Sequence, residues 1–460
     1  MRRLAIATVF MLAGASGAYA AACPVSAGFP IYAPDDNSAS VAIDFFEATF
    51  GNAATCTLDV TARLLTPEPD VFALYSATYK TNSLEDDTVS ITVDRNGGTF
   101  AGTGTADNVN ANGDVEYSDF IAKSSDGKLK STVTIKVLTD VSNGGSSYTF
   151  DSLDFDEFAR TTRTQVNTSL NQINIASLGL VTHLDGMNSL LTGGNRPVEG
   201  DNEVGTFGAI GSYDFGAHGR FNLAEGFSVL GGVSIFDFAS TNATARGFGG
   251  AIAVRYLDPN PGQGRLLIEG GLDANSLSAV SFTRTYNYSQ GGTAKTATAT
   301  GTGTGSTAGI YGKAGMLWAV DESNEVLVSA TLKQSMLGIA TYAETFSAAN
   351  NPFPANLAGS QTMFTTARAG ADWTAHLTAD VDLTASVGLG ATFAKGGTTA
   401  VVFGGGSATG AAQSTVFADY GVRLGWKPSP NFGVDGFLRG TTGTGIGTHL
   451  QAGAGARLTF

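Results

Sequence analysis

The sequence predicts an all-β membrane protein, in which a small all-β domain and one helix precede a 12-strand antiparallel transmembrane β-barrel. Three observations predict this fold class. Glycine fills 61 of the 460 positions, and only 14% of the residues are charged, where soluble proteins have roughly 25%. Segments after Asp201 alternate in polarity with their charges on one face, and no apolar run approaches the roughly 20 residues of a spanning helix. The last segment, Leu450 to Phe460, alternates up to a terminal aromatic residue.

Residues 1–20 have the composition of a secretory signal peptide. Two arginines precede an apolar run from Leu4 to Ala15, and small residues follow as far as Ala20, after which we expect cleavage. Lipidation of Cys23 is the alternative, although a lipoprotein signal would place leucine where Ala20 stands. Export would bring Cys23 and Cys56 into an oxidising compartment, so we expect a disulfide that closes a loop of roughly 33 residues.

Residues 21–158 are predicted to form an exported β-rich domain, a meander or small sandwich. Short alternating runs such as Val89 to Val93 and Val133 to Val137 are separated by turn signals such as Asn112-Gly113. Roughly 21 acidic and 8 basic residues lie between Ala21 and Arg160, so this domain carries nearly all of the net charge of −14. Such a surface argues against nucleic acid as a partner.

No catalytic constellation is found in this exported domain. All four histidines, His183, His218, His376 and His449, lie outside it, which excludes Ser-His-Asp, Cys-His and His-ligated zinc chemistry there. A surface hydrolase with paired carboxylates is the remaining enzymatic alternative, but the acidic residues are too scattered to nominate a pair. We therefore expect a binding module rather than an enzyme, and no cofactor.

One segment of the domain has the ligand spacing of a calcium loop. Oxygen-bearing side chains recur at alternate positions with Gly113 between them, and the candidate ligands are Asn108, Asn110, Asn112, Asp114 and Asp119. The segment differs from an EF-hand at both ends, where Asn replaces Asp and Asp replaces Glu, and no helices flank it. A hairpin turn rich in asparagine and glycine has the same composition.

Residues 160–194 are predicted to form a helix that fills a pore. A stripe of mostly apolar residues recurs at steps of three and four: Val166, Leu170, Ile173, Ser177, Leu180, Leu184, Met187 and Leu191. Gly193-Gly194 would end this helix of about 30 residues, or roughly 45 Å. A coiled coil is the alternative, but two glycines and few heptads weaken it. Within a barrel, the surrounding wall would stabilise the helix.

The segment 201–460 is predicted to be the barrel. Five short turns, with both ends of the segment on their side, require 12 strands, and the three tryptophans precede such turns as an interfacial girdle would. Longer loops are expected at 291–307, 348–360 and 396–410, and the first of these contains Gly301, Gly303 and Gly305, which we do not interpret as a phosphate-binding motif. Polar residues expected to face the lumen and hold the helix are Arg255, Glu269, Asp273, Asp419 and Arg423.

A signal peptide, an exported domain, one helix and a barrel ending in Leu458 and Phe460 together resemble a classical autotransporter of the type V secretion pathway. The resemblance covers the order and size of every segment. It implies that the barrel is monomeric, lies in the outer membrane after insertion by the barrel-assembly machinery, and presents residues 21–158, the passenger, at the cell surface. Leu458 and Phe460 would be the signal that the machinery reads.

The chain departs from the family in two respects, because its passenger is not a long β-helix and its helix has no Asn-Asn pair, which puts self-cleavage in doubt. The passenger is expected to bind or adhere to an unknown surface ligand. The competing hypothesis is an outer-membrane pore or transport barrel with a periplasmic N-terminal domain and a gating helix.

Overall fold

The computed structural model describes residues 21–22, 31–33, 38–41, 46–50, 55–64, 68–83, 88–94, 103–107, 115–123, 127–139, 146–194, 196, 201–260, 264–403 and 406–460. These residues divide into two compact units. Unit 1 comprises Met1–Glu68 and Leu74–Phe158, and unit 2 comprises Pro69–Ala73 and Ala159–Phe460.

Unit 1 is built from β-strands wherever it is described. Strand order in its first sheet is β1-β5-β10-β7-β8, with β2 also paired to β5. The central strands pair antiparallel as predicted, whereas the two short strands β1 and β2 pair parallel with β5. The strands of this sheet are β1 (Ala21–Ala22), β2 (Ile31–Ala33), β5 (Thr55–Leu64), β7 (Thr88–Asp94), β8 (Thr103–Asp107) and β10 (Lys128–Thr139). The remaining strands are β3 (Ser38–Val41), β4 (Phe46–Phe50), β6 (Val71–Ser83), β9 (Val115–Ala122) and β11 (Ser146–Thr162). Residues 71–73 of β6 and 159–162 of β11 belong to unit 2.

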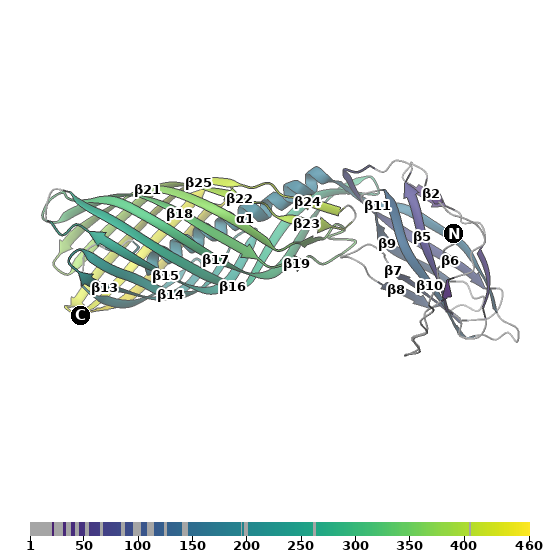
Figure 1. Ribbon diagram of the computed structural model, residues 1–460, viewed down its shortest axis with the longest axis horizontal. Coiled ribbons are helices and arrows are strands. Elements are labelled where there is room, and N and C mark those ends of the chain that lie inside the picture. Colours follow the sequence, from purple (N-terminus) through teal and green to yellow (C-terminus); the bar gives the residue numbers. More distant parts are fainter. Residues whose placement is uncertain are drawn as a thin grey trace, which may run out of the picture. The chain divides into compact units, whose positions relative to one another are not determined.

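Unit 2 is a closed antiparallel barrel of 12 strands around a single helix, in the part of the chain that the structure describes (Figure 1). Each strand pairs with the next, and β12 pairs with β27 from Glu203↔Thr459 to Ile210↔Ala452, which closes the cylinder. The predicted fold class of the barrel is thereby confirmed. Its strands are β12 (Glu203–Ile210), β13 (Tyr213–Ala224), β14 (Phe227–Ala239), β15 (Ala243–Leu257), β16 (Arg265–Gln290), β17 (Thr293–Ala319), β18 (Asn324–Ile339), β21 (Ser360–Thr378), β22 (Val381–Lys395), β25 (Ser414–Ser429), β26 (Phe432–Gly443) and β27 (Gly447–Thr459).

The two faces of the wall follow the alternation in the sequence. In β15 the side chains of Phe248, Ile252 and Val254 are exposed on the outside, while Arg255 is buried inside. The same division recurs around the wall, so the outer surface is an apolar band suited to lipid. Because successive residues of a strand point to opposite faces, one pattern decides both surfaces.

The two ends of the barrel differ in their connections. The end that carries the five short turns, here called the turn end, also holds the start of β12 and the end of β27, as predicted. All three tryptophans, Trp318, Trp373 and Trp426, are partly exposed on the outer wall near this end, where an interfacial girdle belongs. The opposite end, here called the loop end, carries the two long connections, 340–359 and 396–413. Its other four connections, 211–212, 240–242, 291–292 and 444–446, are only two or three residues long.

One predicted loop is wrong. Residues 291–307 were expected to be a loop, but β17 begins at Thr293 and pairs with β16 without a break except for one irregularity near Leu277. Only Gly291 and Gly292 form the turn, both with positive φ, which glycine adopts without strain. Gly301, Gly303 and Gly305 therefore lie in a strand, and the glycine-rich run is no loop. The other two predicted loops carry short strands of their own, described below.

Helix α1 (Arg163–Leu191) runs inside the barrel (Figure 1), which confirms the predicted luminal helix. Within the described residues, α1 included, the structure holds no helix whose length and apolarity suffice for crossing a membrane. The N-terminus of α1 lies at the loop end, where Gln172 bonds to Thr285 of β16, and its C-terminus lies at the turn end, near Arg255. The chain therefore passes through the lumen from the loop end to the turn end before β12 begins.

Candidate functional site: the helix inside the barrel

The ends of α1 are fixed by local sequence. Thr162 accepts a hydrogen bond from the amide of Gln165, and the side chain of Gln165 accepts one from the amide of Thr162, which is a capping box. The helix stops before Gly193 (φ +112°) and Gly194 (φ +44°), conformations that favour glycine. Both boundaries agree closely with the helix predicted from the sequence.

The helix is buried on more than its apolar stripe. The predicted stripe from Val166 to Leu191 is buried, but so are Asn174, His183 and Asn188 on the polar side. Leu191 packs with Phe207 and Ala251 of the wall near the turn end. Buried amide and imidazole groups require polar partners, so the wall must supply them.

Around the C-terminal part of the helix, toward the turn end, the wall supplies charged partners. Lys333 of β18 contacts Asp185 of the helix at 2.7 Å and also pairs with Asp273 of β16. Asn188 donates to the same Asp273 carboxylate at 3.1 Å. Arg439 of β26 donates to the carbonyl of Gly186. These contacts fix both the depth and the rotation of the helix.

Arg255 adds a contact at the end of the helix. Its guanidinium donates to the carbonyl of Thr192 at 3.2 Å and pairs with Glu269 at 2.7 Å. Tyr311 donates to the other oxygen of Glu269 at 2.8 Å. Terminal carbonyls of a helix have no partner in the helix itself, so a cation there is stabilising.

The five predicted luminal residues divide into two groups. Arg255 and Asp273 bond directly to the helix segment, and Glu269 acts through Arg255. Asp419 pairs instead with Arg368, and Arg423 pairs with Asp382 and Asp435, all of them on the wall. The last two residues therefore hold strands together rather than the helix. The helix partners Lys333 and Arg439 were missed.

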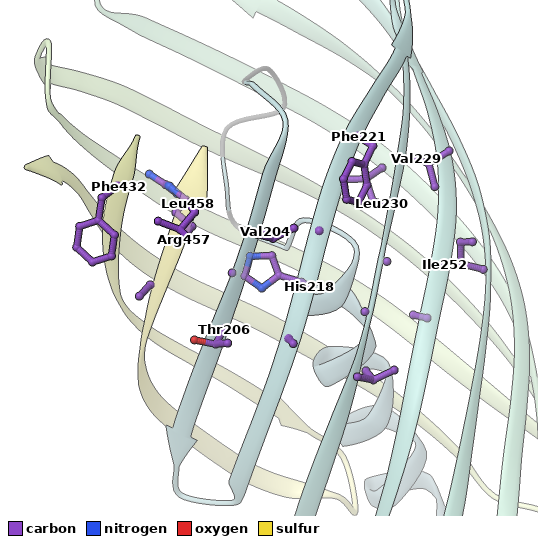
Figure 2. A pocket seen from close by; sticks show the side chains of 18 residues that line it. Val204, Thr206, His218, Phe221, Val229, Leu230, Ile252, Phe432, Arg457 and Leu458 are labelled. Atoms are coloured by element: carbon purple, nitrogen blue, oxygen red, sulfur yellow. The ribbon is translucent and has the colours of Figure 1, made fainter. Parts of the chain in front are cut away.

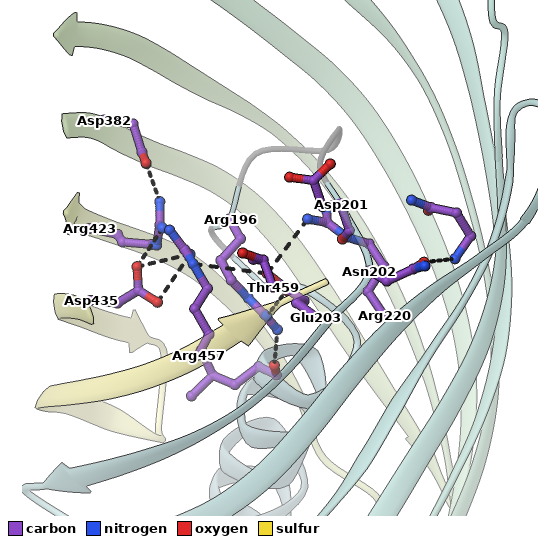
Figure 3. A network of polar contacts seen from close by, with 12 residues as sticks. Arg196, Asp201, Asn202, Glu203, Arg220, Asp382, Arg423, Asp435, Arg457 and Thr459 are labelled. Carbon is purple, nitrogen blue, oxygen red and sulfur yellow. Dashed lines mark hydrogen bonds and ion pairs between the residues drawn. The ribbon is translucent and has the colours of Figure 1, made fainter. Parts of the chain in front are cut away.

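The mouth at the turn end holds a network of buried charges (Figure 3). Glu203, the first residue of β12, pairs with Arg196 of the segment after the helix and lies 3.6 Å from Arg220. Arg457 of β27 lies 4.0 Å from Glu203 and 3.1 Å from Asp435. Burial lowers the pKa of Arg196 to about 10, against the opposing effect of Glu203, so Arg196 remains charged at neutral pH. The network joins both strands of the closing pair to the chain that leaves the helix.

At the loop end a buried ion pair contacts the helix. Arg284 of β16 pairs with Glu344 at 2.7 Å, and both side chains are almost completely buried. Arg284 also donates to Ser169 of the helix at 2.9 Å and to the carbonyl of Phe353 at 2.8 Å. This cluster was not predicted, because Glu344 lies in a connection with no repeating pattern.

The chain before the helix is paired to the longest hairpin of the barrel. Ala159 and Arg160 pair antiparallel with Gln290 and Ser289, at the tip of β16–β17. Thr161 donates to the carbonyl of Asn287 at 2.7 Å. The three residues Ala159 to Thr161, just before the helix, are therefore held at the loop end.

The end of the chain lies on the outer wall at the turn end. Phe460 is 66% exposed, its amide donates to the carbonyl of Asn202 at 3.0 Å, and its ring lies 6.2 Å from that of Phe221. Leu458 is also exposed on the outside. The two predicted signal residues are thus accessible from the membrane side.

Beside this closing pair the outer wall is hollowed (Figure 2). A hollow of about 820 Å³ lies over the first strands of the barrel, where small residues such as Ala217, Gly219 and Gly231 replace bulky ones. Larger apolar side chains, among them Phe221 and Leu458, border it. His218, which is buried, also contributes to the lining.

Two predicted sites of unit 1 fall outside what the structure describes. Of the calcium ligands, Asn108, Asn110, Asn112 and Asp114 lie outside the described residues, and Asp119 is described only as a member of β9. Cys23 likewise lies outside them, and Cys56 is described only as a member of β5. Calcium binding and the disulfide remain predictions.

The fold and the site define a closed transmembrane β-barrel with a resident helix that the wall holds by specific polar contacts. No family model and no curated protein matches the chain. Among solved structures it is similar to the translocator domain of the autotransporter NalP from Neisseria meningitidis, with 13% identity and a TM-score of 0.40, over 62% of this chain and 97% of that one.

Two further structures illustrate the range of similar barrels. The beta domain of the Bordetella autotransporter Brka has 14% identity and a TM-score of 0.33, over 56% of this chain and 99% of that one. The KdgM porin has 10% identity and a TM-score of 0.27, over 56% of this chain and 99% of that one.

Proposed function

We propose that this chain is an autotransporter, whose barrel lies in the outer membrane and carries residues 21–158 to the cell surface. The direction of the chain through the lumen supports the proposal. In bacterial barrels short turns face the periplasm and longer loops face outward. Helix α1 ends at the turn end and begins at the loop end, so the chain before Arg163 continues on the outer side.

The pairing of Ala159 and Arg160 with the β16–β17 tip supports the same reading. If the helix only filled the lumen, the residues before it would not need to pair with the barrel at the loop end. Here the residues just before the helix pair with β16 at that tip and so add a third strand beside the hairpin. The contacts of Asp185, Gly186 and Asn188 with the wall then keep the helix in the lumen once export is complete.

Residues 21–158 would act as an acidic binding or adhesive module with no catalytic residue. A Cys23–Cys56 disulfide would stabilise the module after its signal peptide is removed. Its surface ligand is unassigned, and calcium at the Asn108–Asp119 segment is a candidate cofactor. Insertion would use the barrel-assembly machinery through Leu458 and Phe460, and the barrel would act as a monomer.

Site-specific proteolysis of intact cells tests the proposal. One variant carries a protease recognition site at Asn143–Gly145, where the sequence predicts a turn, and a matched control carries the same site in the Asp321–Ser323 turn of the barrel. The proposal expects the protease to cut the first variant in intact cells and the second only after the outer membrane is permeabilised. The competing pore with a periplasmic domain predicts that unit 1 is protected in intact cells, and that result would overturn the proposal.

A further inference from the structure

A small sheet spans the loop end from the barrel wall to the helix. Its strands, in the order β19-β20-β23-β24, are β19 (Tyr342–Ala343), β20 (Ala355–Leu357), β23 (Thr399–Val402) and β24 (Gly406–Thr409). On one side the Gly301↔Glu344 bridge and a 2.8 Å bond from the amide of Ala340 to Thr304 join it to β17. On the other side β24 lies next to α1 and is hydrogen-bonded to it. We call this sheet the loop sheet.

The free edge of β24 presents backbone groups to the helix. Pairing with β23 uses alternate residues, since the amide of Gly410 donates to Thr398 at 2.9 Å and Ala400 opposes Ala408. The backbone groups of Ser407, Thr409 and Ala411 therefore point away from β23. An open edge of this kind has a row of donors and acceptors that need partners.

Side chains of the helix supply those partners in register. Arg163 donates to the carbonyl of Ser407, the amide of Thr409 donates to Asn167 Oδ1 at 3.1 Å, and the amide of Ala411 donates to Asn171 Oδ1 at 2.7 Å. Each step of two residues along the strand matches a step of four along the helix. The two repeats are about 6.6 Å and about 6.0 Å, so one helix face can follow a strand edge over this distance.

Asn174 completes the row at its buried end. Its amide donates to the carbonyl of Ala411 at 2.8 Å, while its oxygen accepts from the amide of Thr398 at 3.1 Å and from the hydroxyl of Thr398 at 2.7 Å. Asn174 and Thr398 are both buried. This one side chain therefore joins both strands of the β23–β24 hairpin to the helix.

We propose that Asn167, Asn171 and Asn174 form a latch that closes the loop sheet over the mouth only when α1 is docked. The helix takes the place of a fifth strand, and the four-residue spacing of its side chains places one of them at each free backbone group of the edge. A polypeptide that moves through the lumen presents no fixed row of this kind, and any backbone pairing that it makes with the edge is lost as it moves on, so the sheet is latched only after α1 docks. This order of events rests on the proposed export function.

Hydrogen exchange on the purified full chain in lipid nanodiscs tests the latch without any export step. In the variant N167A/N171A/N174A we expect exchange of the Thr409 and Ala411 amides to accelerate about tenfold or more, since a net hydrogen bond of usual strength changes an opening equilibrium by that factor. Amides near Asp185 should keep their protection, because the Lys333 contact remains. The variant N188A, which removes only the bond to Asp273, should leave Thr409 and Ala411 unchanged.

A conservative variant separates the latch from general loosening. In N167D/N171D the acceptor oxygens remain, so protection at Thr409 and Ala411 should stay near the wild-type level. Unchanged exchange in the triple alanine variant, or in N171A if the triple variant fails to fold, would overturn the latch. Surface proteolysis of unit 1 is a separate readout, so failure of the latch and failure of the export function give different results.

Discussion

Lys333 Nζ of the barrel wall lies 2.7 Å from Asp185 Oδ1 of the helix, and the same ammonium group pairs with Asp273. One cation thus serves a carboxylate of each element inside the lumen. Removing one partner of a buried pair leaves the other charge without compensation, which costs more than the pair contributes.

Replacing Lys333 by methionine should therefore weaken docking of the helix. We expect a loss of about 3–5 kcal/mol, the usual cost of breaking a buried pair from one side. Limited proteolysis of the purified protein should show faster cleavage within α1, while the barrel remains resistant. Lys295→Met at the exposed β16–β17 tip is the matched control and should have no effect. Equal cleavage in both variants would contradict the assignment.

The stability of the closing pair of strands, β12 and β27, should depend on Glu203. Three arginines, Arg196, Arg220 and Arg457, surround this carboxylate, so Glu203→Gln leaves excess positive charge buried at the mouth. Unfolding of the barrel in denaturant, followed by tryptophan fluorescence, should shift by about 3 kcal/mol or more. Asp237→Asn, which removes the partner of the well-exposed Arg246, should shift it by less than about 1 kcal/mol.

Replacing Phe460 should reduce insertion of the barrel into the outer membrane more than it reduces the stability of the inserted barrel. Its ring is mostly exposed and touches only Phe221 among the ring contacts of the described residues, so Phe460→Ala removes little buried surface. We expect less folded barrel in the outer membrane, measured as the heat-modifiable fraction on gels, with nearly unchanged unfolding of the protein that does insert. Phe221→Ala removes the same ring contact but keeps the chain end, and normal insertion of this variant would separate the two roles.

The lipid-facing sides of β21 and β22 predict that the cost of introducing a charge depends on its depth in the membrane. Val387 is exposed on the outer face at the middle of the strand, and an arginine there should cost about 2–4 kcal/mol. Leu377 is exposed next to a short turn, where the same change should cost about 0–1 kcal/mol. Unfolding in lipid bilayers measures both. Similar costs at the two positions would mean that the outer band is not in contact with the membrane core.

Strand faces and short turns could be predicted because each depends on a local pattern. Phe248, Ile252 and Val254 alternate with luminal residues. A shift of the strand pairing by one residue would turn these apolar side chains into the lumen, so the alternation determines the register of the strand. The first part of β17, within residues 291–307, was predicted to be a loop because its buried residues are small. Ala297 and Ala299 are buried without producing the hydrophobic signal on which strand assignment depends.

Contacts between helix and wall were predicted only in part. Arg255 and Asp273 stand out as charges on otherwise apolar or small strands, so their luminal position could be inferred. The partners of Asn167, Asn171 and Asn174 are backbone groups of a glycine- and alanine-rich connection more than 200 positions later in the chain. A backbone group has no sequence signal, and such a pairing becomes visible only in three dimensions.

The pairing of β12 with β27 has a consequence for timing. β27 is synthesised after β12, and the cylinder cannot be complete before these two strands meet. The paired residues are more than 240 positions apart in the chain, from Glu203↔Thr459 to Ile210↔Ala452. A hairpin can form as soon as its two strands exist, whereas the closed wall must await this one distant contact, so closure depends on β27 however well the other strands have paired.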